Sequence, residues 1–217
     1  MILLPILLAL QPAPAQPSLD TTPAPWPDDE RELGMVDAYS TDKDGQARRI
    51  MAAYAACVAD GSTDKVAEVL RRDFRTSEYR NGLRNLSRAN EGCARKVGLR
   101  GSLRMANLPF AAALAEEMLR RDPAPLKIRL AKAASGRVVP TYAPSDAVAM
   151  CVARSAPDEV AILFGTAPDS AEEEAALAPI ETVAAMCSRD ARLEISAVGL
   201  RSIVATASYR LLAAQES

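Results

Sequence analysis

The residues best suited to covalent or metal chemistry are four cysteines, Cys57, Cys93, Cys151 and Cys187. The first two are 36 residues apart, and so are the last two. In exported proteins, an even number of cysteines usually indicates disulfides, whereas thiolate metal sites usually take their ligands from closely spaced pairs. The equal spacing therefore predicts the disulfides Cys57–Cys93 and Cys151–Cys187, with a four-thiolate metal site as the alternative.

Other chemistry is limited by what the sequence lacks. The chain contains no histidine, which excludes Ser-His-Asp and Cys-His catalysis and histidine-bound zinc. It also contains no glycine-rich phosphate loop, no G-x-S-x-G elbow and no C-x-x-C pair. Consecutive residues of a helix point in different directions, so Glu172, Glu173 and Glu174 do not face a common substrate. We interpret them as acids at the start of a helix, where negative charge favours the helix dipole. We therefore expect no catalytic residue, cofactor or metal.

One enzymatic alternative remains, a carboxylate-dependent hydrolase of the cell envelope. It would need two acidic side chains converging on a common site. Asp64 and Asp158 are the candidates because they occupy equivalent positions in a repeat described below, although each also suits the start of a helix.

The charges are divided unequally along the chain, although the net charge is only −2. Residues 46–122 contain 15 basic and 9 acidic side chains, while residues 145–217 contain 5 basic and 11 acidic ones. Within the basic part, Arg80, Arg84 and Arg88 recur every fourth residue and form a stripe on one helix. This stripe is a candidate face for an anionic partner, either an envelope component or a protein; a solvated face is the alternative. We expect no nucleic acid, because no aromatic residues alternate with the arginines.

The first fifteen residues, MILLPILLALQPAPA, have the pattern of a cleaved secretory signal. An apolar stretch from Ile2 to Leu10 is followed by Ala13-Pro14-Ala15, and this stretch is too short to cross a bilayer, which takes roughly 20 residues. We therefore predict cleavage near Ala15 and a periplasmic or secreted protein with no transmembrane segment in the mature form. Residues 16–45 are an acidic, proline-rich lead-in that we expect to be flexible.

The sequence repeats itself with an offset of 94 residues, as CVADGSTDKVAEVL from Cys57 and CVARSAPDEVAILF from Cys151. After the second cysteine of each pair the offset becomes 90, which aligns Leu103 with Leu193. The pattern predicts a mainly α fold in which two tandem helical repeats, residues 46–122 and 145–217, are joined by a linker at 123–144 and pack as one disulfide-stapled core. The whole arrangement resembles uncharacterised exported proteins of alphaproteobacteria over most of residues 46–217. That resemblance supplies no activity and no site residues to transfer. The two-fold repeat, the export signal and the lack of a catalytic constellation lead us to expect a non-enzymatic protein with a binding or structural role.

The helices that we expect share apolar positions spaced three or four residues apart. In the first repeat they lie near residues 46–59, 64–72, 77–95 and 108–121. In the second repeat one helix begins at residue 145, and the others lie at 158–164, 171–187 and 197–214. Pro179 should break or kink the helix at 171–187. Alternating apolar residues suggest short strands at 103–105, 193–195 and 126–130.

Overall fold

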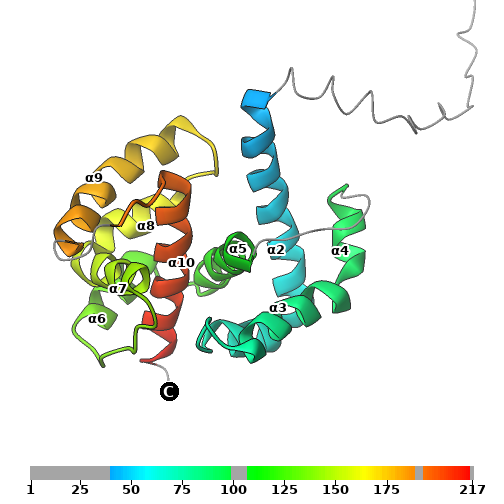
Figure 1. The fold of residues 1–217 in the computed structure, drawn as a ribbon, viewed down its shortest axis with the longest axis horizontal. Helices are drawn as coiled ribbons and strands as arrows, with labels where there is room; N and C mark the ends of the chain where they lie inside the picture. Colours follow the sequence, from blue (N-terminus) through cyan, green and yellow to red (C-terminus); the bar gives the residue numbers. More distant parts are fainter. Residues whose placement is uncertain (1–39, 99–106, 189–192, 216–217) are drawn as a thin grey trace, which may run out of the picture. The chain divides into compact units, whose positions relative to one another are not determined.

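A computed structural model describes residues 40–98, 107–188 and 193–215 of the chain. Within these ranges the protein is helical and contains no β-strand, which confirms the mainly α fold (Figure 1). Ser40–Ser217 forms one compact unit. The signal segment at 1–15, most of the lead-in at 16–45 and the expected strand at 103–105 lie outside the described residues. The helices are α2 (Ser40–Leu70), α3 (Ser77–Ala89), α4 (Glu91–Lys96), α5 (Asn107–Arg121), α6 (Leu126–Ala134), α7 (Pro144–Ser155), α8 (Pro157–Gly165), α9 (Ala171–Cys187) and α10 (Ala197–Ala213).

The first long helix, α2, consists of two helical segments that meet at Ser62, where the backbone leaves the helical region (φ −150°, ψ 36°). The next residue, Thr63, donates its hydroxyl proton to the Ala59 carbonyl at 2.7 Å. In the second half, α7 and α8 are separated at Ala156 (φ −133°, ψ 54°), which lies 94 residues after Ser62. Both halves therefore change helix direction at corresponding positions.

The third helix of each half begins with the same kind of cap. The hydroxyl of Thr76 accepts a hydrogen bond from the amide of Tyr79 at the start of α3, and Ser170 does the same for Glu173 at the start of α9. These cap residues are again 94 positions apart, whereas α5 and α10 start 90 positions apart. The helix starts thus follow both offsets found in the sequence.

Two disulfides each join the first helix of one half to a later helix of the same half. Cys57 in α2 is bonded to Cys93 in α4, and Cys151 in α7 is bonded to Cys187 at the end of α9. This is the pairing that the equal spacing predicts.

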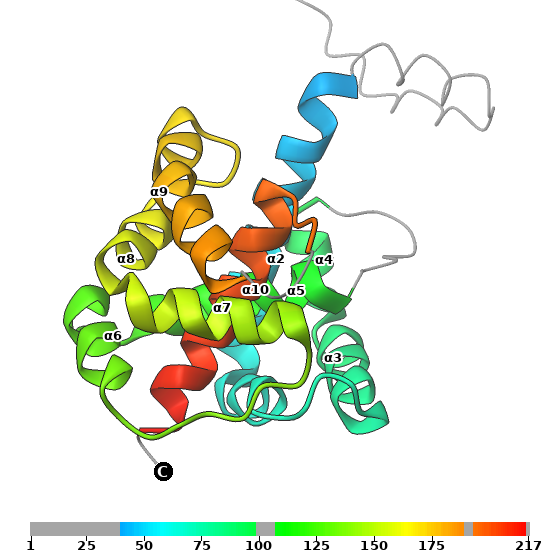
Figure 2. The ribbon, with the colours of Figure 1, turned by 60° about the vertical axis from the view of Figure 1, so that its left-hand side comes forward.

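The core is centred on α5 and α10, which pack against each other (Figure 1). Helix α2 covers α5, and α7 crosses α10, as Figure 2 shows. Leu114 of α5 and Val204 of α10 are fully buried in one hydrophobic cluster that includes residues of both halves. Alanines at 111, 115 and 205 are also fully buried, and such small side chains allow helices to approach closely.

The expected linker at 123–144 contributes to this core, and the strand expected at 126–130 is wrong. The segment forms α6 instead, with Leu130 and Ala133 buried and Ile128 62% exposed. Leu126, Leu130 and Ala133 recur at helical spacing, so the short alternation was compatible with both structures. Tertiary burial of that face selects the helix.

Two further expectations about local structure are also wrong. Residues 193–196 are irregular rather than a strand. Helix α9 continues through Pro179 without a break, because Leu177 and Ile180 on either side of the proline are buried in the core and hold the helix together. In the described part of the chain, no helix is both long and apolar enough to span a bilayer.

Candidate functional site

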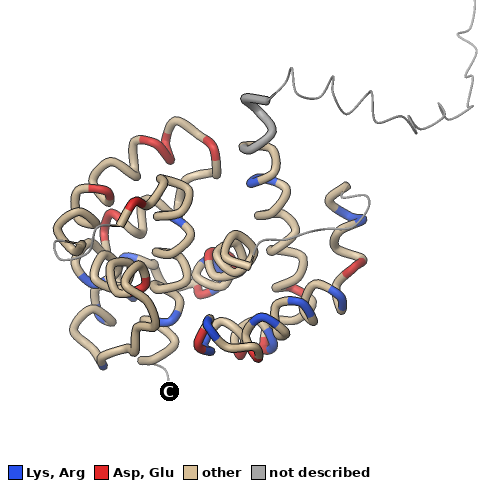
Figure 3. Tube along the Cα trace, in the orientation of Figure 1, with Lys and Arg blue, Asp and Glu red and all other residues tan. Residues whose placement is uncertain are grey.

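The predicted basic stripe lies on the surface of α3. Arg80, Arg84 and Arg88 are all exposed, while Tyr79, Leu83 and Leu86 are buried on another face of the helix. Basic positions recur along α3 in the charge-coloured trace (Figure 3). Arg80 donates to the carbonyl of Arg75 at 2.8 Å, and Arg84 donates to the Asn81 side chain at 2.9 Å. Among the described residues, none of the three stripe arginines forms a salt bridge with a carboxylate. The structure therefore places the three guanidinium groups on one helix surface.

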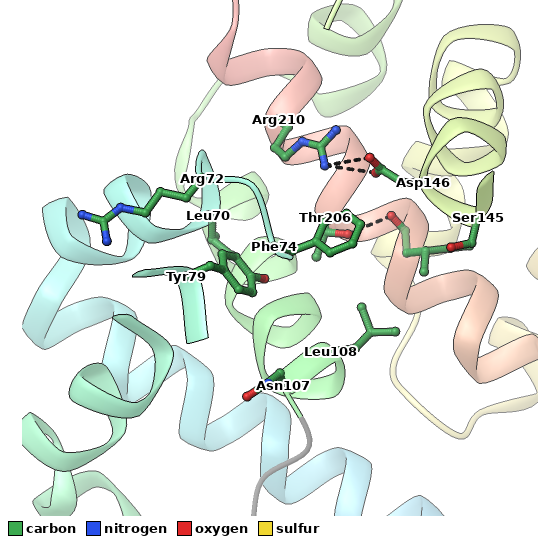
Figure 4. Close-up of a pocket in the computed structure, with 11 residues that line it drawn as sticks. Leu70, Arg72, Phe74, Tyr79, Asn107, Leu108, Ser145, Asp146, Thr206 and Arg210 are labelled. Carbon is green, nitrogen blue, oxygen red and sulfur yellow. Dashed lines mark hydrogen bonds and ion pairs between the residues drawn. The ribbon is translucent and has the colours of Figure 1, made fainter. Parts of the chain in front are cut away.

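A pocket of about 250 Å³ lies between the two halves of the core (Figure 4). Its residues come from the α2–α3 connection, the start of α5, the start of α7 and the middle of α10. We call it the Tyr79 pocket, and its lining is Leu70, Arg72, Phe74, Tyr79, Asn107, Leu108, Ser145, Asp146, Ile203, Thr206 and Arg210.

Tyr79 is a largely buried polar residue of this pocket. Only 6% of the residue is exposed, and its hydroxyl points into the pocket (Figure 4). No hydrogen bond to this hydroxyl is formed by any residue in the described ranges. Burial, supported by the nearby carboxylate of Asp146 and opposed by Arg210, raises the pKa of Tyr79 to about 12. The phenol therefore stays protonated and can donate a hydrogen bond at any physiological pH.

A buried ion pair, Arg210 with Asp146, forms another wall. One Arg210 nitrogen lies 3.0 and 3.1 Å from the two Asp146 oxygens, and the other donates to the Pro140 carbonyl at 2.8 Å. Asp146 also accepts from the backbone amide of Tyr142 at 2.8 Å, and the Arg210 guanidinium lies 4.9 Å from the centre of the Tyr142 ring. Because each charge is already paired and hydrogen-bonded, this wall offers no free charge to a ligand.

The remaining surface of the Tyr79 pocket is largely apolar. Leu70, Phe74, Leu108 and Ile203 line it, and Leu108 at its edge is 42% exposed. The pocket thus combines apolar walls, the hydroxyl donor of Tyr79 and a neutralised ion pair, which suits the binding of a small molecule.

A second cluster of buried charges links three helices on the other side of the α5–α10 pair. Arg201 donates to both oxygens of Glu116, at 2.9 and 2.6 Å, and to Glu173 at 2.9 Å. Their side chains are 3%, 10% and 4% exposed, respectively. We call these three residues the Arg201 network.

Glu173 in this network is held in its ionised form. Burial alone would raise its pKa, but hydrogen bonds from Arg48 and the Asp169 amide, together with the charges of Arg201 and Arg48, outweigh burial and lower the pKa. A carboxylate with a lowered pKa is a poor general acid at neutral pH. Neither Glu116 nor Glu173 is free to act on a substrate, so the network supports folding rather than hydrolysis.

The sequence-based candidates for hydrolysis gain no support from the geometry. Asp158 is on the surface and pairs with Lys127 at 2.6 Å, and Asp64 is exposed. The described residues contain no group of three or more Cys, Asp or Glu side chains that could hold a metal ion.

Sequence reasoning missed both the Tyr79 pocket and the Arg201 network. It assigned Glu173 only to the helix dipole, although Ser170 and Glu173 form the S-x-x-E pattern of a helix start. A second signal was available in α10, where Arg201 and Arg210 interrupt an otherwise apolar helix. Charged residues within such a helix are buried only when they are paired.

Comparisons of the chain with protein-family models, curated proteins and solved structures find no significant match in any of the three.

Proposed function

We propose that this is an exported binding protein that takes a small uncharged molecule into the Tyr79 pocket. The observation that carries the proposal is the hydroxyl of Tyr79, which faces the pocket and has no hydrogen-bond partner among the described residues. A ligand acceptor in the pocket would give this donor a hydrogen bond in a largely buried environment. The two disulfides support the export part of the proposal, because such bonds form in oxidising compartments.

The chemistry of the pocket indicates the class of ligand. Arg210 and Asp146 neutralise each other, and the remaining charged lining residue, Arg72, is paired with Glu68. A charged ligand would therefore be desolvated without finding an unpaired counter-ion there. An uncharged molecule with an apolar body and a carbonyl or ether oxygen would contact the leucine and phenylalanine walls and accept from Tyr79. Its small size follows from the pocket volume of about 250 Å³.

Cyclohexanone is a suitable probe because it has an apolar ring and one acceptor. We expect it to bind the wild-type protein, and we expect Tyr79→Phe to weaken binding about 2- to 12-fold, the effect of losing one neutral hydrogen bond. Tyr54→Phe is the matched control, since it removes another buried tyrosine hydroxyl that is bonded to Ser87 outside the pocket. Saturation-transfer NMR measures the affinities. Equal binding by wild type and Tyr79→Phe would contradict the proposal.

The export step has a separate measurement. Mass spectrometry of protein recovered from the periplasm or medium should show a chain beginning at Gln16. A retained Met1 would count against cleavage at Ala15. It would also count against our proposal that the chain is related to exported alphaproteobacterial proteins.

A second candidate function is the docking of an anionic partner on α3. It rests on the exposed stripe of Arg80, Arg84 and Arg88, which the described structure leaves without carboxylate partners. Replacing all three by glutamine should abolish salt-sensitive retention of the protein on a dextran sulfate column. A matched triple variant at Arg71, Arg95 and Lys96, which removes the same charge elsewhere on the first half, should still be retained. Loss of retention in both variants to the same extent would show a general charge effect instead.

A further inference from the structure

A second pocket, of about 420 Å³, lies between α2, α5 and α10. Alanine, proline, methionine and valine side chains form most of its surface, and Arg48, Glu116, Arg120 and Arg201 supply its charged groups. We call it the Arg120 pocket. Nothing in the proposed function depends on it.

The Arg120 pocket occupies the place in the fold that corresponds to the Tyr79 pocket. Subtracting the offset of 90 maps Val198 onto Leu108, and these residues lie at the edges of the two pockets with 45% and 42% exposure. The same offset relates Ile203 to Ala113, and the offset of 94 relates Pro168 to Phe74. The larger volume of the Arg120 pocket follows from the smaller side chains at these last two positions.

The most informative difference concerns one arginine. Arg210 in the Tyr79 pocket corresponds to Arg120, but its partner Asp146 corresponds to Ala52. The carboxylate that neutralises Arg210 therefore has no counterpart in the second pocket. The only acidic partner of Arg120 in the described structure is Glu117, 3.7 Å away on the same helix, and the Arg120 side chain is 45% exposed.

The other charges of the Arg120 pocket are already paired. Arg201 and Glu116 bind each other through two hydrogen bonds, and Arg48 is held by Glu173 at 2.8 Å. Arg120 is consequently the group best placed to receive an anion, next to apolar walls that include Met51, Ala113 and Val198.

We infer that the Arg120 pocket binds an aliphatic carboxylate. The carboxylate group would pair with Arg120 in the way that Asp146 pairs with Arg210, and the hydrocarbon chain would cover the apolar walls. Burial of the chain supplies most of the affinity, and the charge-assisted hydrogen bond selects the acid over an alcohol of the same length.

Octanoate and 1-octanol test this inference, because they share a chain and differ in the head group. Isothermal titration calorimetry with the disulfide-intact protein should show tighter binding of octanoate. Arg120→Gln should weaken octanoate binding about tenfold or more and leave octanol binding unchanged, since a hydrogen bond to a charged group is worth about 1.5–3 kcal/mol. Ala113→Leu should block both ligands by filling the pocket.

Two variants serve as controls. Tyr79→Phe alters only the other pocket and should leave the affinities for octanoate and octanol unchanged. Arg120→Gln changes an exposed side chain, so this variant tests the inference even if Ala113→Leu fails to fold. No binding of octanoate to wild type, or equal affinities for octanoate and octanol, would overturn the inference. The inference would also be overturned if Tyr79→Phe lost octanoate binding while Ala113→Leu kept it.

Discussion

Replacing Arg201 by methionine tests how the protein tolerates buried charges at the contact between its halves. The substitution keeps a long apolar side chain in α10 but removes the guanidinium. Glu116 then loses both of the hydrogen bonds that the described structure gives it, at 2.9 and 2.6 Å. Glu173 is affected less, because Arg48 and the Asp169 amide still donate to it at 2.8 and 2.7 Å.

The expected loss is large because an uncompensated buried carboxylate remains. Removing one partner of a buried ion pair costs about 3–5 kcal/mol. A domain of ordinary stability has about 5–15 kcal/mol in total, so Arg201→Met should remove roughly a fifth or more of it. Urea unfolding followed by far-UV circular dichroism, with the disulfides intact, measures the free energy of unfolding.

The double variant Arg201→Met/Glu116→Leu separates this cause from a simple packing defect. It removes both charges, so no buried carboxylate is left unpaired by the loss of Arg201. We expect its free energy of unfolding to return to within about 1–2 kcal/mol of wild type, since apolar replacements of buried ion pairs are often neutral. The reasoning would be refuted if Arg201→Met cost less than about 1 kcal/mol, or if the double variant were no more stable than the single one.

Three further measurements address other parts of the core. Glu173 has a folded-state pKa below its ordinary value of 4.5, so its contribution to stability is present above that pH and is lost as the pH falls toward the folded-state pKa. The difference in unfolding free energy between wild type and Glu173→Gln should therefore narrow as the pH falls below 4.5, and a constant difference would contradict this. The hydroxyl of Ser208 is fully buried without a hydrogen-bond partner in the described structure, so Ser208→Ala should raise the free energy of unfolding by about 1 kcal/mol, whereas a loss of stability would show that the hydroxyl is satisfied. Replacing both Cys57 and Cys93 by alanine opens a loop of about 37 residues and should cost about 3–4 kcal/mol in the chain-entropy model, with an unchanged urea midpoint as the contrary result.

Local signals in the sequence were sufficient for most of the helices. Ser196, of a residue type that favours the N-cap, directly precedes α10, and its hydroxyl accepts from the amide of Gly199 at 3.1 Å. Equal cysteine spacing led to the pairing that the structure contains. These features depend on residues close in sequence or on the repeat itself, so they can be read without knowledge of the tertiary structure.

The sites depend on contacts that no local pattern contains. Glu116 and Arg201 are 85 residues apart, and Arg210 and Asp146 are 64 residues apart. The helix that packs against such a charge decides whether the charge is buried. The strand expected at 126–130 was wrong because tertiary packing, too, decides between helix and strand for a short apolar pattern. Burial of Leu130 against the rest of the core stabilises the helix α6.

Tyr79 and Glu173 show how the two halves use one backbone position for different chemistry. They are 94 residues apart, each amide donates to the hydroxyl of its helix cap, and the two residues are 6% and 3% exposed. The capped helix start therefore directs this side chain into the protein in both halves, whatever the side chain is. Glu173 meets Arg48 and Arg201 there, whereas the Tyr79 hydroxyl meets a pocket and no partner in the described structure. The same helix position therefore holds a buried ion-paired carboxylate in the second half and places a hydroxyl donor at a pocket in the first half.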